Sequence, residues 1–244
     1  MFAFTSERSE LGLTELTEIL DLPKSTVHRA IANLEVRGLL VRNEVTNKYH
    51  LGSRLFELGM RASLNFDLRE IARPYLEKLS KETGEMITLA ILSEDEALYL
   101  DKVDSSRVLR AASAVGQRRP LHCTAVGKVM LSDLPQHEVV RIVEEKGLAP
   151  RTSRTITDPD DLNRKLTQIR SDGYSLDLGE FEEGLCCVAT PIMDGTGKIT
   201  ASIGVSGPVT RFNEEARPGL IKLMQQTAEE ISKELGYEPI ISES

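Results

Sequence analysis

Residues 12–38 read GLTELTEILDLPKSTVHRAIANLEVRG, and this stretch decides the fold of the N-terminal part of the chain. Apolar side chains recur at helical spacing from Leu13 to Leu20, which predicts a short helix with Leu13, Leu16, Ile19 and Leu20 on one face. Asp21-Leu22-Pro23 breaks this pattern, and Pro23 suits the first turn of a second helix because its missing N–H costs nothing there. We expect that helix to run from about Pro23 to Arg37 and to end at Gly38. Its apolar stripe is predicted to consist of Val27, Ala30, Ile31 and Leu34.

A short β-hairpin is predicted next, with strands at 39–42 and 48–51 around a polar loop. Two helices joined by a tight turn and followed by a basic hairpin are typical of a winged helix-turn-helix. In that motif the first residues of the second helix enter the major groove of double-stranded DNA, and the wing contacts phosphates. The predicted DNA-binding residues are therefore Lys24, Ser25, Thr26, His28 and Arg29 on the helix and Arg42 and Lys48 on the hairpin.

The charge distribution supports a polyanion contact near the N-terminus. The 244-residue chain has a formal net charge of −8, yet the segment from Asp21 to Arg54 has six basic and three acidic side chains. Where positive charge is located matters more for DNA binding than the total. Trp is absent and aromatic residues make up only 5%, which argues against stacking on single-stranded nucleic acid as the main activity.

Cysteine usage and hydropathy indicate a cytoplasmic protein. The three cysteines, Cys123, Cys186 and Cys187, are odd in number and two are adjacent, so a disulfide framework is not expected. No signal peptide is recognisable, and no apolar run is long enough to span a bilayer, so no membrane association is expected. No cofactor is expected either.

The remainder of the chain mixes helices and strands. A linker helix is predicted from Gly52 to about Asn65, and a long helix from Leu68 to Thr83. Strands are predicted at 86–92, 97–103, 185–193 and 199–205, and helices at 125–131, 136–146 and 159–172. Asn213 is predicted to cap a final helix that extends to about Leu235. This pattern predicts a DNA-binding domain at 1–51, a linker at 52–67 and an α+β domain at 68–244.

These residues together resemble the IclR family of transcription regulators. The helix-turn-helix of that family is matched by Gly12–Leu16 and Leu22–Arg29, and the end of its wing by Lys48–Gly52. Two further matches are Leu121–Lys128 and Ser206–Pro208. The spacing of the family's C-terminal signature is matched by Gly173, Asp177, Glu180, Cys187, Val188, Ala189, Ile192 and Asp194. The matches occur in order over essentially the whole chain, which makes the resemblance specific.

Two positions and the start of the chain depart from the family pattern. Met193 stands where the signature usually has an aromatic residue or His, and Gly204 stands where the family has Ser, which removes one hydroxyl from the expected pocket. Only Met1–Arg8 precede the Gly-Leu-Thr segment, whereas family members usually have a full helix there. Either that helix is clipped, which weakens the N-terminal dimer contact, or the chain starts elsewhere.

The resemblance implies an N-terminal winged helix-turn-helix and a C-terminal GAF-like α/β effector-binding domain. It implies a homodimer or tetramer on double-stranded operator DNA, more often a repressor than an activator. The expected effector is a small molecule, namely a carboxylate or an aromatic acid. The implied pocket residues are Leu121, Thr124, Ala125, Gly127, Asp177, Leu185, Cys187 and Ser206.

A physical account is available for some of these pocket positions. Thr124–Gly127 begins a predicted helix, and exposed N–H groups at a helix N-terminus suit a carboxylate. Gly127 would let a ligand approach the backbone. Asp177 could accept a hydrogen bond from a ligand hydroxyl. Cys187 can equally be a small core residue on a strand.

Other classes of protein were weighed against a regulator. Cys123 or Cys187 with His122 could form a nucleophile–base pair, but adjacent residues on an extended segment point to opposite sides. The cysteine spacing does not match a zinc site, and Gly195–Lys198 lacks the flanking residues of a phosphate-binding loop. The alternative left open is a sensor module or enzyme of GAF-like fold without sequence-specific DNA binding. A steep salt dependence of DNA affinity would distinguish the regulator.

Overall fold

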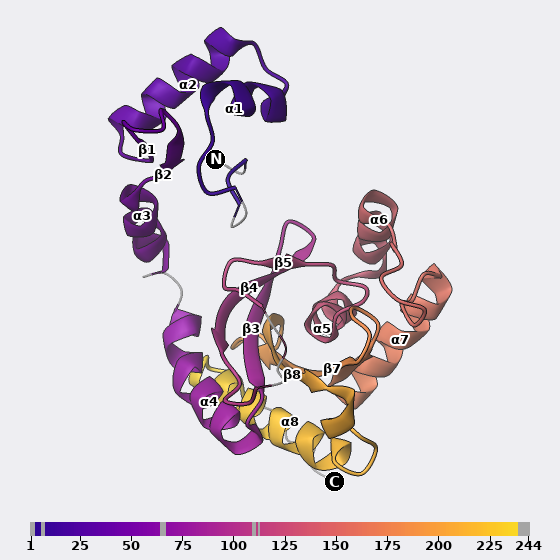
Figure 1. The fold of residues 1–244 in the computed structure, drawn as a ribbon. Coiled ribbons are helices and arrows are strands. Elements are labelled where there is room, and N and C mark those ends of the chain that lie inside the picture. The colour runs from indigo at the N-terminus through magenta and orange to yellow at the C-terminus, as the bar shows by residue number, and fades with distance from the viewer. Residues whose placement is uncertain (1–2, 6–7, 64–66, 109–110, 112, 239–244) are drawn as a thin grey trace. The chain divides into compact units, whose positions relative to one another are not determined.

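The computed structural model describes residues 3–5, 8–63, 67–108, 111 and 113–238 (Figure 1). The chain folds into two compact units, Met1–Asp67 and Leu68–Ser244. The segment predicted as a linker, 52–67, is therefore part of the first unit, and its residues 64–66 lie outside the described part of the chain. No helix within the described residues has the length and apolar character needed to cross a membrane.

The first unit is a helix-turn-helix followed by a small hairpin. Its elements are α1 (Leu13–Leu20), α2 (Lys24–Val36), β1 (Leu40–Arg42), β2 (Tyr49–Leu51) and α3 (Ser53–Ser63). Strands β1 and β2 pair antiparallel, and Leu11 adds an isolated bridge to Tyr49. Asp21 ends α1 in a left-handed conformation at φ 48°, and Pro23 precedes α2 as its N-cap, so the turn is as tight as expected.

The core of the first unit contains fewer side chains than the hydrophobic pattern predicts. Leu16, Val27 and Ile31 are buried together with Leu11, Leu40 and Tyr49. Ile19 and Leu20 are 40% and 43% exposed, and Ala30 is exposed as well, so these three predicted core positions are wrong. A unit this small has too little interior to cover every apolar side chain of two helices.

The second unit is built on one six-stranded antiparallel sheet. Its order is β5-β4-β3-β8-β7-β6, with every neighbouring pair antiparallel. The strands are β3 (Met86–Ser93), β4 (Glu96–Val103), β5 (Arg118–Arg119), β6 (Ser175–Leu178), β7 (Leu185–Met193) and β8 (Ile199–Pro208). The short edge strands β5 and β6 are absent from the sequence prediction, because strands of two and four residues carry little hydrophobic pattern.

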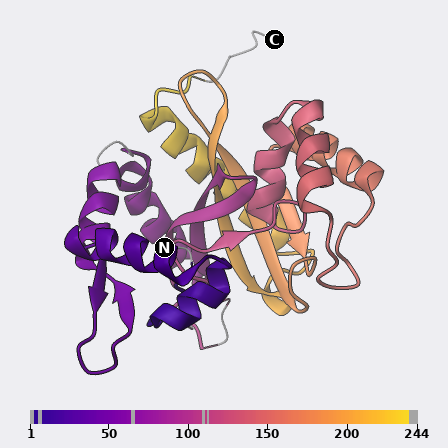
Figure 2. The same ribbon diagram turned by 90° about the horizontal axis from the view of Figure 1, so that it is seen from above.

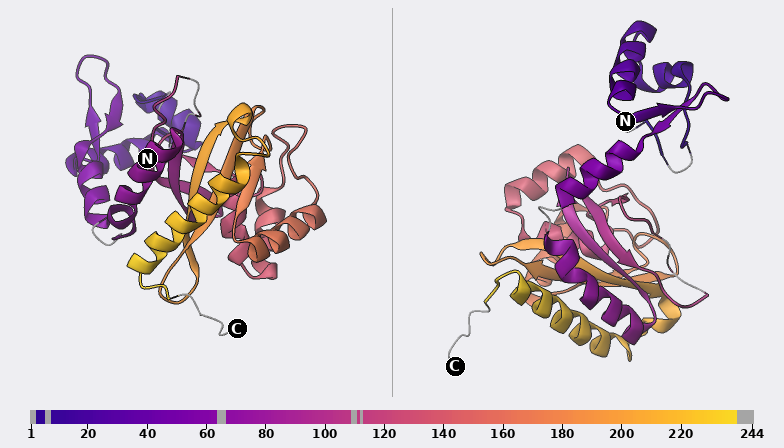
Figure 3. Two further views of the ribbon diagram at one scale, coloured as in Figure 1. Left: turned by 90° about the horizontal axis from the view of Figure 1, so that it is seen from below. Right: turned by 90° about the vertical axis from the view of Figure 1, so that its left-hand side faces the viewer.

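Helices cover both faces of this sheet (Figures 2 and 3). On one face α4 (Asp67–Thr83) and α8 (Arg217–Glu234) pack against β3, β7 and β8 around Leu76, Ile203 and Ile231. On the other face α5 (Ala125–Asp133), α6 (Gln136–Lys146) and α7 (Pro159–Asp172) form a second core around Val129, Leu131 and Leu166. The sheet therefore has one hydrophobic core on each face, so the unit has three layers.

The start of α8 differs from the prediction. The helix begins at Arg217, after a short 3₁₀ turn at Val209–Arg211, rather than directly after Asn213. The side-chain oxygen of Asn213 instead accepts a hydrogen bond from the Ala216 N–H at 2.9 Å. Asn213 therefore closes a turn that precedes the helix, which is another ordinary role for an Asn side chain.

Candidate functional site

The exposed face of α2 carries the residues predicted to read DNA. Lys24, Ser25, Thr26, His28 and Arg29 are all exposed, whereas Val27 between them is buried. The helix thus holds its polar side chains outward by anchoring Val27 and Ile31 in the core. Its N-terminus also presents free N–H groups, since Pro23 offers no capping side chain, and such groups favour a phosphate.

The two predicted wing residues are held by other parts of the first unit. Arg42 donates from Nη2 to Oδ1 of Asn47 at 2.8 Å. The Lys48 ammonium lies 3.0 Å from Oε1 of Glu15 on α1, and Oε2 of Glu15 accepts from the Gly12 N–H at 2.6 Å. The hydrogen bond from Gly12 and the pairing with Lys48 lower the pKa of Glu15. Lys48 thus forms an ion pair that links the wing to α1, whereas the sequence analysis predicted only a contact with a phosphate.

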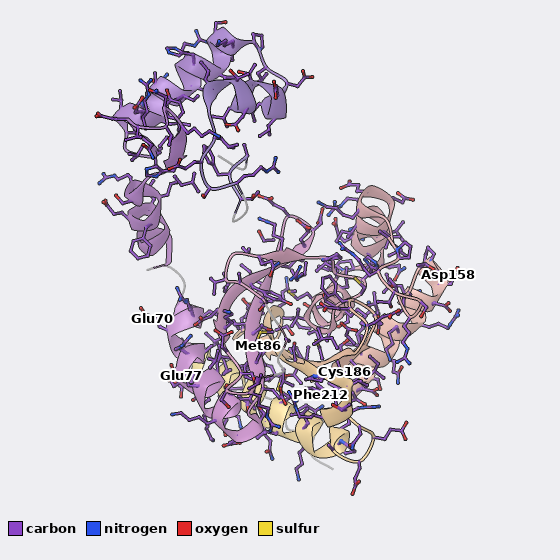
Figure 4. The ribbon with its side chains drawn as sticks, in the orientation of Figure 1. Glu70, Glu77, Met86, Asp158, Cys186 and Phe212 are labelled. Carbon is purple, nitrogen blue, oxygen red and sulfur yellow. The ribbon has the colours of Figure 1, made fainter. Side chains whose placement is uncertain are left out.

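A row of side chains across the sheet of the second unit forms the floor of a cavity. Strand register places Asp177 on β6 opposite Cys187 on β7, Cys187 opposite Ser206 on β8, and Ser206 opposite Met86 on β3. The Sγ of Cys187 lies 3.0 Å from the Oγ of Ser206. Met86, labelled in Figure 4, begins β3 at the end of this row.

The first turn of α5 and the loop between β6 and β7 complete this cavity, called the effector cavity below because the family resemblance predicts effector-binding residues here. Six of the eight predicted pocket residues line it: Thr124, Ala125, Asp177, Leu185, Cys187 and Ser206. The Thr124 hydroxyl caps α5 by accepting from the Gly127 N–H at 3.3 Å and itself donates to the Pro120 carbonyl at 2.7 Å. By the general rule for helix ends, the N–H groups of Ala125 and Val126 are then left for another acceptor.

Leu121 and Gly127 do not line this cavity. A Cβ on Gly127 would lie 2.5 Å from both the Cα and the carbonyl oxygen of Leu121. The glycine is therefore needed so that α5 can pack on the segment before it, and ligand approach is not the reason for it. Gly204, in the cavity wall, has a similar role because a Cβ there would lie 2.8 Å from a methyl group of Val126.

Several lining residues were not anticipated from the sequence. They are Met86, Thr88, Tyr99, Ala111, Ser113, Arg119, Val126, Phe181 and Glu182. Gly204, which the family pattern placed at the expected pocket, lines the cavity as well. Arg119, on the edge strand β5, brings a positive charge to the cavity, and its guanidinium lies 4.8 Å from the centroid of the Phe181 ring. The basic pair at 118–119, directly before the Leu121–Lys128 motif, was the one available sequence signal.

Asp177 stabilises the β6–β7 loop through hydrogen bonds to its backbone. Its Oδ1 accepts from the N–H of Glu180 at 2.6 Å and of Phe181 at 3.4 Å. Burial, opposed by the Glu180 N–H and reinforced by the nearby Glu180 charge, raises the pKa of Asp177 to about 6. The carboxyl group therefore remains largely ionised at neutral pH but gains a proton in mildly acidic solution.

The cysteines do not form a nucleophilic centre. Burial raises the pKa of Cys123 to about 12 and also raises the pKa of Cys187 well above its usual range. His122 donates through Nε2 to the Ala149 carbonyl, 3.2 Å away, and burial lowers the pKa of His122. A thiol held protonated by its surroundings is a poor nucleophile.

Known protein families match both units of this chain. Residues 1–44 match the IclR helix-turn-helix domain, and residues 60–233 match the family described as bacterial transcriptional regulator IclR, C-terminal. The chain belongs to the IclR family. Its fold is accordingly an IclR helix-turn-helix followed by the α/β C-terminal domain of that family, as the sequence resemblance implied. The family consists of DNA-binding transcriptional regulators rather than enzymes.

Named IclR relatives extend over nearly the whole chain. The HTH-type transcriptional regulator KdgR of Escherichia coli is 39% identical over 231 residues, which covers 95% of this chain and 88% of that protein. The HTH-type transcriptional repressor AllR of Salmonella typhimurium is 31% identical, covering 95% of this chain and 85% of that one.

Solved IclR structures have the same fold. The Thermotoga maritima IclR crystal structure aligns with a TM-score of 0.74 at 33% identity, over 93% of this chain and 92% of that one. An IclR homolog from Microbacterium hydrocarbonoxydans, solved in complex with 4-hydroxybenzoate, aligns with a TM-score of 0.84 at 28% identity, over 96% and 95% of the two chains.

Proposed function

We propose that this IclR-family protein is a repressor that binds double-stranded operator DNA through α2 and the wing and releases it when a small carboxylate occupies the effector cavity. Relatives named as repressors support the direction of control. The 4-hydroxybenzoate complex of the Microbacterium hydrocarbonoxydans homolog supports the ligand class, since that ligand is a carboxylic acid.

The observation that carries the effector proposal is the position of Arg119. Its guanidinium is half-buried at the effector cavity, and no described carboxylate lies within ion-pair distance of it. A guanidinium fork matches the geometry of a carboxylate, and binding an anion there would satisfy charge that the protein leaves unpaired. The N–H groups of Ala125 and Val126 lie on the same cavity and suit the same anion.

The remaining polar groups suit a ligand with hydroxyl or carbonyl oxygens. Thr88, Tyr99, Ser113 and Ser206 each bring a hydroxyl to the wall. The cavity itself measures about 40 Å³, far below the roughly 300 Å³ of ordinary ligand pockets. An effector therefore has to displace side chains on entry, which gives it a means of favouring one conformation over another.

The DNA proposal assigns sequence reading to Arg29 and backbone contacts to the wing. Arg29 is exposed in the first half of α2, where a side chain can form paired hydrogen bonds with a guanine edge. We propose a homodimer or tetramer that places two such helices on the half-sites of a pseudo-palindrome. Effector control of affinity then requires different binding to the two arrangements, typically worth about 1–3 kcal/mol.

Selection from a pool of random duplexes, followed by anisotropy titrations on the selected site, tests the DNA proposal. Arg29→Ala is expected to weaken binding about 5- to 150-fold, the loss of one good base contact. Arg37→Ala, at the far end of α2, is the matched control and should bind like wild type. Equal affinities of Arg29→Ala and wild type at every salt concentration would remove Arg29 from the reading face.

Thermal-shift screening of the full chain against small carboxylates, sugar acids and aromatic acids tests the effector proposal. A stabilising acid should lose its effect in Arg119→Gln and keep it in Arg164→Gln, which removes an exposed arginine on α7. The same acid should lower the affinity of the full chain for the selected duplex. A stabilising acid that binds Arg119→Gln as well as wild type would refute this location.

A further inference from the structure

A second cavity in the C-terminal unit is separate from the effector cavity. It lies among α6, the turn between β3 and β4, and the segment at 120–122 that leads into α5. Its volume is about 170 Å³, about four times that of the effector cavity. Among the described residues, none lines both cavities.

The inner wall of this α6 cavity is apolar. It is formed by Leu121, Leu131, Ile142, Val143 and Leu148, of which Leu121, Leu131 and Ile142 are almost fully buried. His122 also lines it, but burial lowers the pKa of His122 and favours the neutral ring. An apolar cavity of about 150 Å³ can hold a benzene-sized molecule, so the space here suits one six-membered ring or a short branched chain.

The rim of the α6 cavity carries two cations without a carboxylate partner. Lys146 ends α6, and Arg151 follows in the connection to α7; both are exposed. In the part of the chain that the structure describes, no Asp or Glu oxygen lies within 4.0 Å of either charged group. The two cations can therefore face the same bound anion from one side of the opening.

The two acids on the rim are engaged by other arginines. Both carboxylate oxygens of Asp95 are held by Arg141, at 2.9 and 3.0 Å. Glu96 lies 3.9 Å from Arg118. Because Asp95 and Glu96 pair directly with these arginines, Lys146 and Arg151 are the charged groups of the rim that have no ion-pair partner within 4.0 Å among the described residues. An anion is the ligand that could pair with them directly.

We propose that the α6 cavity is a second ligand site, which takes a small monocarboxylate with an apolar body of about one ring. The body occupies the space against Val143 and Leu148, and the carboxylate lies at the rim between Lys146 and Arg151. An uncharged ring should bind more weakly, because it is stabilised only by its contacts with the apolar wall. A sugar acid should also bind more weakly, because its hydroxyl groups find no hydrogen-bond partners on that wall.

The Phe181 ring lies between this site and the effector cavity. Arg151 of the α6 cavity lies 5.5 Å from the ring centroid, and Arg119 of the effector cavity lies 4.8 Å from it. An anion that draws Arg151 away from Phe181 would change the surroundings of Arg119. The second site is therefore placed where occupancy can modulate effector binding, although its existence does not depend on the effector proposal.

The test uses benzoate and the full chain carrying ¹³C-labelled methyl groups. Benzoate is expected to shift the methyl resonances of Ile142, Val143 and Leu148, with a dissociation constant that can be fitted from the titration. Lys146→Glu should weaken this binding at least tenfold, because it replaces an attracting charge with a repelling one. Lys198→Glu, an equal charge change on the exposed β7–β8 turn, should leave the constant unchanged.

Two further variants distinguish the site from the effector cavity, and a second ligand tests the role of charge. Arg119→Gln should leave the Val143 and Leu148 shifts intact, whereas Val143→Phe, which fills the α6 cavity, should abolish the response of Leu148. Benzyl alcohol should bind more weakly than benzoate to wild type and about equally to Lys146→Glu. The proposal is overturned if benzoate leaves these methyl groups unshifted, or if Lys146→Glu and Lys198→Glu bind it equally.

Discussion

Lys128 on α5 is ion-paired with Glu180 in the β6–β7 loop, and its ammonium group also donates to the Leu176 carbonyl at 2.8 Å. The Lys128 side chain is completely buried, and the loop it holds carries Phe181 and Glu182 to the effector cavity. The pair thus ties the helix that begins the cavity to the loop that closes it.

Breaking this pair should be more damaging than replacing it. Lys128→Met leaves the Glu180 carboxylate buried without its partner, which is expected to cost about 3–5 kcal/mol of unfolding free energy. The double variant Lys128→Met with Glu180→Leu removes both charges and should recover much of that loss. Urea denaturation of the full chain measures both. A double variant no more stable than the single one would contradict the explanation from an unpaired charge.

The elevated pKa of Asp177 predicts a pH dependence of stability. Since its pKa rises from 3.8 to about 6 on folding, the folded protein binds a proton that the unfolded chain releases between those values. The contribution of Asp177 to stability is therefore complete below about pH 4 and is lost as the pH rises through about 6.

Asp177→Asn should flatten this decline, because the amide cannot ionise while its oxygen still accepts from the Glu180 N–H. Urea denaturation across about pH 4 to 7 is the measurement. The control is Asp194→Asn on the exposed β7–β8 turn. Hydrogen bonds from Thr196 lower the pKa of Asp194, so this carboxylate stabilises the protein as the pH rises, which is opposite to the effect of Asp177. A slope unchanged in Asp177→Asn would mean that another group titrates in this range.

Releasing Lys48 from Glu15 should increase non-specific DNA binding. Glu15→Gln removes the carboxylate that pairs with Lys48 and leaves its ammonium free to contact a phosphate. The expected result is a tighter complex with random duplex DNA and a slope of log affinity against log salt that is steeper by up to about 0.9. Fluorescence anisotropy at several salt concentrations gives both quantities.

Glu18→Gln is the matched control for this experiment. Glu18 lies exposed on the same helix, and its substitution removes the same charge without touching Lys48. If both variants gain the same affinity for random duplex DNA, the gain comes from the change in net charge, and the ion pair between Lys48 and Glu15 has no role in it.

The packing role of Gly127 can be separated from any role in ligand binding. Gly127→Ala places a methyl group 2.5 Å from backbone atoms of Leu121, and it is expected to destabilise the protein by about 1–3 kcal/mol with no ligand present. Gly219→Ala, on α8 with open space around its Cβ, should instead stabilise it by about 0.5–1 kcal/mol. Thermal unfolding of unliganded protein would show the two shifts in opposite directions.

Local sequence was enough to predict most helices and long strands. The α7 boundaries follow from Asp158, whose side chain accepts from two backbone N–H groups, and from Gly173, whose φ of 70° ends the helix. β7 and β8 follow from two apolar runs around a Gly-containing turn. Each of these signals acts over a few residues, so no tertiary contact was needed to recognise them.

Register and charge pairing were decided only by the tertiary structure. No local pattern shows that Asp177, Cys187 and Ser206 lie in one row, because that depends on the order and alignment of three strands. The position of Arg119 at the effector cavity and the ion pair between Lys48 and Glu15 also could not be predicted, because the residues involved lie far apart in the sequence.

The sequence by itself therefore determined the family, the fold class and the exposed face of α2, since helical periodicity and capping are local and the motifs are contiguous. The tertiary structure alone decided which side chains face a common cavity and which charges remain unpaired at its wall. Those properties depend on the distance between residues brought together by folding, and free energies of charge and packing change steeply with that distance.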